Sequence, residues 1–150
     1  MEATGAVALN GAVTATAAGS TVTIDAGGDI TVTTINANAI SAETTNGAIN
    51  QTSGAITTAD GTDVSDFTAT TSVTLDQVGN DFGGPLALSG QTVTIRDTDA
   101  LILDDVTATG AECAADSNFA GAFGDCGEHD VHDADAAHEQ RDSCDAAEYD

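Results

Sequence analysis

The sequence predicts an all-β fold, a parallel β-solenoid, from three observations. Short runs of valine, isoleucine and threonine recur through the first 110 residues, and most start about seven to ten residues apart. The runs are about four to six residues long, which suits the sides of a coil. Aromatic residues make up only 3% of the chain, too few for the thick core of a barrel or sandwich. An antiparallel sandwich is the main alternative.

The segment STVTIDAGGDITVT, residues 20–33, shows the repeating unit. Val22 and Ile24 alternate with threonine, Gly27 and Gly28 turn the chain, and the alternation resumes at Ile30. Similar runs predict strands that begin near Val13, Val22, Ile30, Ile40, Ile49, Ile56, Val73, Leu86, Val93 and Leu101. Because a coil of three such strands needs about 20–27 residues, residues 1–110 are expected to form about four to five coils.

Side chains alternate between the two faces of a strand, which assigns each residue to a face. The aliphatic residues expected to point inward are Val22, Ile24, Ile30, Val32, Val73, Leu75, Leu86, Leu88, Val93, Ile95, Leu101 and Leu103. The threonines expected to point outward are Thr21, Thr23, Thr31, Thr33, Thr92 and Thr94. Asn36, Asn38, Asn80 and Phe82 are expected to serve turns and local packing. Each coil is expected to hydrogen-bond to the next, because one coil cannot bury its own apolar side.

The chain is strongly acidic, with 25 Asp and Glu residues against two arginines and a formal net charge of −23. This charge repels phosphate backbones and anionic headgroups, so binding to nucleic acid or to a membrane surface is not expected. No apolar run approaches the roughly 20 residues of a spanning helix, so direct membrane insertion is not expected either. A secreted acidic surface and adaptation to high salt both explain the acidity.

Composition divides the chain into a body, residues 1–110, and a tail, residues 111–150. In the tail Val131 is the only β-branched residue and leucine is absent, whereas all three cysteines and all three histidines lie there. The tail has fair helical propensity but no large apolar residue at helical spacing, so it is expected to be disordered or weakly helical. A change of reading frame near Gly110 is another explanation of the shift.

The segment LDQVGNDFGGPLALSGQTVTIRDTDALILDDVTATG, residues 75–110, resembles repeats of large bacterial β-helical surface proteins. These are the filamentous-haemagglutinin-like adhesins of two-partner secretion and the autotransporter passengers. The matching elements are Asn80 to Gly83, Leu86 to Gly90, Val93 to Asp97, Ala100 to Leu103 and Val106 to Gly110. Looser threonine-, alanine- and glycine-rich coils extend the likeness over most of residues 6–110.

The resemblance implies a right-handed parallel β-helix that acts as an elongated adhesin outside the cell or on the bacterial cell surface. It carries over no catalytic residue and no cofactor. The sequence has no signal peptide and no translocation domain, and the tail has no counterpart in the repeats. We therefore expect the chain to be a segment of a longer exported protein.

Six residues of the tail have side chains of the types that bind zinc. They are Cys113, Cys126, His129, His132, His138 and Cys144. The tail has no Cys-x-x-Cys pair and matches no known ligand spacing, and its acidic flanks attract divalent cations unselectively. The six residues are therefore only candidate metal ligands, and an unstructured tail with incidental Cys and His is the favoured interpretation.

Two calcium-binding patterns in the sequence are incomplete. The segment DAGGD, Asp25–Asp29, is a single imperfect copy of a glycine- and aspartate-rich repeat. Asp133 and Asp135 open like an EF-hand loop, but the sixth position is His138 and the twelfth is Cys144. The sequence therefore predicts no calcium site.

Threonine pairs of the type Thr-x-Thr suggest an ice-binding face. They are Thr14/Thr16, Thr21/Thr23, Thr31/Thr33, Thr68/Thr70, Thr92/Thr94 and Thr107/Thr109. An ice-binding face needs one pair per coil at a constant period, and these pairs are irregularly spaced. Ordinary strand threonines facing solvent explain them better.

The sequence thus predicts a non-enzymatic structural or adhesive repeat segment, since no nucleophile or acid–base pair occurs in a plausible site. Its expected partner is a surface ligand, either carbohydrate or protein. End-to-end self-association is also expected, because residues 1–10 begin with strand-like alternation and contain no cap. The alternative function is a small acidic ion-binding protein whose Cys/His/Asp tail binds divalent metal.

Overall fold

The structure, a computed structural model, describes residues 1–59, 61–110 and 113–116. Within these ranges the chain forms sixteen strands, β1 to β16, and no helix. The strands make three parallel sheets, here called A, B and C. None of the described segments forms a helix long and apolar enough to cross a membrane.

Sheets A and B each take one strand from every successive described coil, and sheet C takes one from each of the first four. Sheet A contains β1 (Glu2–Ala3), β4 (Thr21–Ala26), β7 (Ala39–Thr44), β10 (Ser65–Thr68), β13 (Leu86–Gly90) and β15 (Leu103–Ala108). Sheet B contains β2 (Val7–Ala8), β5 (Ile30–Val32), β8 (Ile49–Gln51), β11 (Ser72–Leu75), β14 (Thr92–Arg96) and β16 (Cys113–Asp116). Sheet C contains β3 (Val13–Ala15), β6 (Ile35–Ala37), β9 (Ile56–Thr58) and β12 (Asp81–Phe82).

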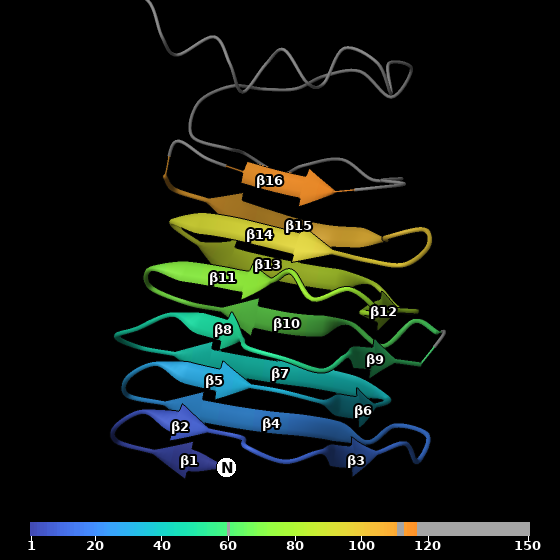
Figure 1. Cartoon of the computed structure of the whole chain (residues 1–150), viewed down its shortest axis with the longest axis horizontal. Coiled ribbons are helices and arrows are strands. Elements are labelled where there is room, and N and C mark those ends of the chain that lie inside the picture. The colour runs from blue at the N-terminus through green and yellow to red at the C-terminus, as the bar shows by residue number, and fades with distance from the viewer. Residues whose placement is uncertain (60, 111–112, 117–150) are drawn as a thin grey trace, which may run out of the picture.

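The strands stack into a β-solenoid of about five turns, which confirms the predicted fold class (Figure 1). In Figure 1 sheet B lies in front with its strands running right, and sheet A lies behind with its strands running left. The chain rises from coil to coil in this view while it runs right in front and left behind, and this sense of winding is right-handed. Coil length varies: Thr21 pairs with Ala39, 18 residues on, whereas Ser41 pairs with Asp66, 25 residues on.

Most predicted strand starts are confirmed, including Val13 of β3 and Ile56 of β9 in sheet C, but the other two strands of that sheet were missed. Strand β6 falls on Asn36, and β12 falls on Asp81 and Phe82, all of which were expected near turns. Strand β6 contains an asparagine and β12 directly follows one, and asparagine is a typical turn residue, so both segments were assigned to turns. Pairing with the neighbouring coils defines them instead, as in the register of Asn36 with Thr57.

The core is a column of aliphatic side chains along the solenoid axis. Ile30, Ile49, Val73 and Val93 lie in register on successive coils and are all buried. Of the twelve residues predicted to point inward, ten are buried, while Val22 and Leu103 are partly buried against the core. The six threonines predicted to point outward are exposed or half-buried. Burial of each large aliphatic side chain contributes about 1.5–3 kcal/mol.

Two phenylalanines fill the interior where β10 and β12 lie in the same coil. Phe67 and Phe82 are both fully buried, and their rings meet edge to face with centroids 6.4 Å apart. Such pairs add about 0.5–1.5 kcal/mol beyond burial of their area. Phe82 is therefore a core residue of sheet C: its expected packing role is confirmed, but it lies in strand β12 and not in a turn.

The corner between sheets A and B leaves no room for a side chain at Gly47. A Cβ atom there would lie 2.6 Å from the backbone nitrogen of Asp29 and 2.7 Å from the carbonyl carbon of Gly28, on the preceding coil. Glycine therefore allows successive coils to approach closely at this corner.

Strand β16 begins after Gly110, the residue at which the body was expected to end. It pairs in parallel with β14, with Val93 in register with Cys113. The backbone of the described solenoid thus extends to residue 116.

Candidate functional site

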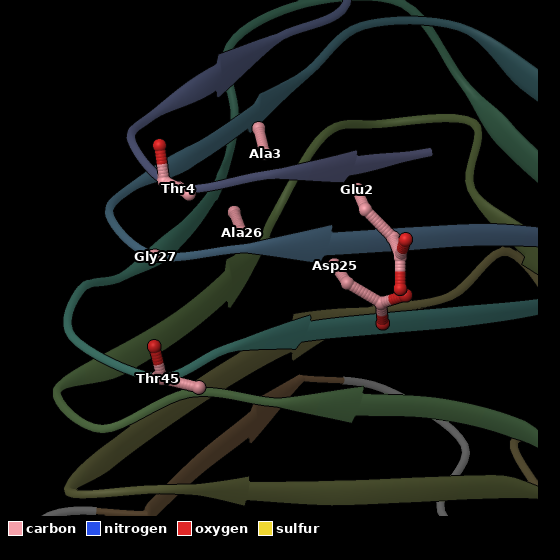
Figure 2. Close-up of a pocket in the computed structure, with 7 residues that line it drawn as sticks. All are labelled: Glu2, Ala3, Thr4, Asp25, Ala26, Gly27 and Thr45. Carbon is pink, nitrogen blue, oxygen red and sulfur yellow. The ribbon is translucent and has the colours of Figure 1, made fainter.

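The outer face of sheet A is acidic. Its outward-facing carboxylates belong to Glu2, Asp25, Glu43, Asp66, Asp104 and Asp105. Glu2, Asp25 and Glu43 lie in register on three successive coils, and Figure 2 shows the carboxyl groups of Glu2 and Asp25 side by side. Like charges at directly opposite positions of a sheet destabilise the pairing of its strands. The acidic face also repels anions in solution.

The outer face of sheet B carries mainly hydroxyl and amide groups, although β14 ends with Arg96 on this face and β16 ends with Asp116. Strands β2, β5, β8, β11 and β14 contain no Asp or Glu. Thr31, Asn50, Thr74 and Thr94 form one column in register, flanked by Ser72 and Thr92. We call these six residues the polar face of sheet B. All six are half-buried, and none of their side chains hydrogen-bonds to another described residue.

An open hollow of about 490 Å³ lies at the turn after β1 and β4 (Figure 2). It is lined by Glu2, Ala3, Thr4, Asp25, Ala26, Gly27 and Thr45. Its ionisable side chains are two exposed or half-buried carboxylates. Among these described lining residues, no side-chain nucleophile is hydrogen-bonded to a base.

Three carboxylates converge where β12 meets the turn after β14. Asp81, Asp97 and Asp99 each offer an oxygen atom, and these atoms lie within 4.8 Å of one another. Asp97 is only 4% exposed, and its Oδ1 accepts a hydrogen bond of 3.0 Å from the backbone N–H of Phe82. Carboxylate oxygens suit hard cations such as Ca²⁺, but that ion takes about six to eight oxygens. These three side chains would supply only part of such a shell.

Burial raises the pKa of Asp97 above its ordinary value of 3.8, and the nearby Asp99 and Asp81 raise it further. The backbone N–H groups of Phe82 and Thr98 act in the opposite direction but do not cancel the effect. A carboxyl whose pKa is raised on folding stabilises the fold below its unfolded pKa. This contribution is lost as the pH rises through the folded pKa.

The variant Asp97→Asn is therefore expected to lose this part of the pH dependence of stability. An asparagine Oδ1 still accepts the hydrogen bond from Phe82, while the ionisable group is gone. The free energy of unfolding of the variant, measured in urea, should exceed that of the wild type increasingly as the pH rises from about 3.8 toward 7. Asp104→Asn, at an exposed position, is the control. A stability difference that does not change with pH would contradict the prediction.

Two buried amides bridge the third and fourth coils. Asn80 Nδ2 donates to Gln51 Oε1 at 2.8 Å, and Gln51 Nε2 donates to Asn80 Oδ1 at 2.7 Å. Asn80 also accepts from the backbone N–H of Ile56 and donates to the carbonyl of Leu75. The sequence suggested a turn role for Asn80 but gave no sign of its partner, which lies 29 residues away.

Most of the predicted metal ligands lie outside the described residues. These are Cys126, His129, His132, His138 and Cys144, as are the EF-hand-like Asp133 and Asp135. Cys113 opens β16, where only its backbone is described.

The other patterns singled out in the sequence have structural positions. In the DAGGD segment, Asp29 Oδ1 accepts a hydrogen bond of 2.9 Å from the backbone N–H of Ala48 on the next coil. The Thr-x-Thr pairs are spread over sheets A, B and C, so they do not form one continuous column.

A family model described as repeats of unknown function (DUF5649) matches residues 19–89. The match begins just before β4 and ends within β13, so it covers the second to fourth coils of the solenoid. The chain is a β-solenoid repeat protein. No curated protein and no solved structure matches it significantly. The matching family has no assigned role, and the resemblance to adhesins stays a prediction.

Proposed function

We propose that this β-solenoid is a non-enzymatic adhesive segment of an exported bacterial surface protein, and that sheet B is its contact face. The observation that carries the proposal is the separation of charge between the two large sheets. In a chain of net charge −23, carboxylates line the outer face of sheet A, while the polar face of sheet B has none. A ligand approaching sheet B meets hydrogen-bonding groups without a local negative charge.

The residue types of the solenoid support a role without catalysis. Residues 1–110 contain no Cys, His, Lys or Tyr, so most of the side chains that serve as nucleophiles or as bases near neutral pH are missing. Six of the remaining carboxylates lie on strands of sheet A, where they are exposed or half-buried. This composition suits a surface that binds a ligand better than one that catalyses a reaction.

The size and chemistry of the polar face favour an uncharged carbohydrate as the ligand. The polar face lies on four strands, β5, β8, β11 and β14, which at about 4.8 Å spacing lie about 14 Å apart from first to last, enough for a short oligosaccharide. Thr31, Asn50, Thr74 and Thr94 repeat a donor or acceptor at each strand along it. A stable protein–protein interface buries about 800 Å² on each partner, more than this narrow face provides.

The test is binding of the chain to immobilised uncharged and anionic polysaccharides. We expect an uncharged polysaccharide to bind, and Thr74→Asp, at the centre of the polar face, to weaken that binding at least about tenfold, or about 1.4 kcal/mol. The matched control is Thr23→Asp, which adds the same charge at an outward-facing threonine of sheet A. Equal losses in both variants, or binding only to anionic polysaccharides, would refute the proposal.

The alternative is an acidic ion-binding protein that works through its tail. Its candidate metal-binding residues lie outside the described residues, except Cys113, of which only the backbone is described. Titration of the full chain with Zn²⁺ and Ca²⁺ separates the two functions. Stoichiometric binding at about micromolar concentration would favour the alternative.

A further inference from the structure

We propose that the outer face of sheet A, where β10, β13 and β15 lie side by side, is an interaction surface for a cationic amphipathic helix of another protein. The helix lies along the solenoid axis. Its apolar side covers a row of apolar residues, and its basic side faces the carboxylates beside that row. The proposal concerns sheet A alone and is independent of the ligand of sheet B.

The first feature of this surface is a row of apolar side chains. The backbone N–H of Ser65 donates to the carbonyl of Pro85, and that of Leu86 donates to the carbonyl of Ile102, both at 2.9 Å. Val64, Pro85 and Ile102 therefore lie at one level on three successive coils, immediately before β10, β13 and β15 (Figure 1). Val64 is 41% exposed and Ile102 is 45% exposed, while Pro85 is half-buried. Single apolar residues are common on a surface, but these three form a continuous stripe.

The outward direction of this row is determined within the solenoid and not by the ends of the chain. Strand β10 lies between β7 and β13, and β13 lies between β10 and β15. Val64 and Pro85 thus have a coil on either side. Their neighbours Ser65 and Leu86 are buried, so alternation along the strand directs Val64 and Pro85 outward. Ile102 extends the same row on the next coil.

The second feature is a row of carboxylates beside the apolar row. Asp66 is in register with Ala87, and Ala87 is in register with Asp105. Asp66 and Asp105 are exposed, as is Asp104 next to them. A strand rises about 3.3 Å per residue, so the carboxylates lie about 7 Å along the strands from the apolar row. The strands of sheet A contain no Lys, Arg or His that could neutralise them.

The charge of this chain excludes its own segments as the occupant of the surface. Residues 111–150 contain 12 Asp and Glu residues and one arginine, so the carboxylate row repels them. A second copy, with a formal net charge of −23, is repelled as well. Charge complementarity therefore requires a different protein, one that combines basic and apolar side chains.

A helix matches the spacing of the row better than a strand does. Helix positions i, i+3 and i+7 lie on one face and span about 10.5 Å at about 1.5 Å per residue. Three neighbouring strands span about 9.6 Å at about 4.8 Å spacing. Lysine or arginine on the flank of the helix would then lie beside Asp66 and Asp105. An added β-strand is excluded between these coils, because β10 and β13 already pair on both sides.

The first test is the binding of a labelled leucine–lysine peptide to the 150-residue chain, followed by fluorescence anisotropy. The peptide has about 18 residues, or about five helical turns, with its leucines on one face. A peptide of the same composition in scrambled order measures the general attraction of a cationic chain to this acidic protein. At about 0.15 M NaCl, where the screening length is about 8 Å, the amphipathic peptide should bind at least about tenfold more tightly. Equal binding of the two peptides would overturn the proposal.

A matched pair of valine variants tests the apolar row. Val64→Ser removes two methyl groups from the contact, so it should weaken binding of the amphipathic peptide at least about fivefold. Val78→Ser makes the same change at a valine that is 79% exposed between β11 and β12, away from sheet A. This control should change binding less than about twofold. Equal effects of the two variants would contradict the proposed contact.

Methyl NMR of the wild type locates the peptide without any variant. On addition of the amphipathic peptide, the methyl resonances of Val64 and Ile102 should shift, because the helix covers them. Those of Val78 should stay unchanged. Shifts that leave Val64 and Ile102 unaffected would show that the peptide binds another face, and the proposal would fail.

Discussion

Replacing Asn80 by alanine is expected to lower the free energy of unfolding by about 4 kcal/mol. Asn80 is 0% exposed, and its amide takes part in four hydrogen bonds of 2.7–3.0 Å. Truncation leaves the N–H of Ile56, the carbonyl of Leu75 and the amide of Gln51 buried without these partners. Each such group costs about 1–3 kcal/mol, and partial relaxation of the coil lowers the sum.

Denaturation in urea measures this loss, with Asn36→Ala as the control. Asn36 is exposed on β6, so its replacement should change stability by less than about 0.5 kcal/mol. Asn80→Asp extends the test, because a carboxylate accepts from Ile56 but cannot donate to Leu75, and it should be at least as destabilising at neutral pH. A loss below about 1 kcal/mol for Asn80→Ala would show that the network is not needed.

Replacing Phe67 by alanine is expected to cost a similar amount, about 4 kcal/mol. The side chain is 0% exposed and packs edge to face on Phe82 at a centroid distance of 6.4 Å. Its removal loses the transfer free energy of the ring and leaves a cavity that the stacked coils on either side cannot fill. Phe67→Leu retains most of the volume and should lose less than half as much.

Val64→Ala is the matched control, since Val64 is 41% exposed and lies three positions from Phe67 in the chain. Thermal or urea unfolding of the three variants gives the comparison. Because solenoid coils contact mainly their neighbours, the loss should be centred on the third to fifth coils. Equal stability of Phe67→Ala and Val64→Ala would mean that the aromatic pair does not organise the core.

Alternation along the chain was enough to predict strands in all three sheets, including β3 and β9 of sheet C, although β10 of sheet A was missed. Side chains alternate between the two faces of a strand, so neighbouring residues are enough to assign a face. The threonines beside Ile24, Val73 and Ile95 therefore predicted that these three side chains point inward. Strand β12 has no such signal, since Asp81 and Phe82 form a strand only by pairing with Thr57 and Thr58. The candidate metal ligands of the tail stay predictions, because they lie outside the described residues. Cys113 is the exception, and only its backbone is described.

The buried amide pair shows why candidate sites were harder to predict than strands. Asparagine near glycine is a typical turn signal, and Asn80 does lie beside a turn glycine, Gly79, with a positive φ of 99°. Its hydrogen bonds to Gln51 and Ile56 require the register of the third coil on the fourth. No local pattern encodes that register, because the two residues are 29 positions apart.

The sequence by itself determined that this protein is a repeated, thin-cored and acidic β-solenoid, because strand alternation, turn residues and composition are local properties of the chain. Only the tertiary structure decided where its charges lie. Glu2, Asp25 and Glu43 are separated by unequal intervals of 23 and 18 residues, yet they form one column. Thr31, Asn50, Thr74 and Thr94 align likewise on sheet B. Coil lengths differ because the turns differ, so the register between coils, set by burial of the core, separates the acidic column of sheet A from the column of hydroxyl and amide groups on sheet B.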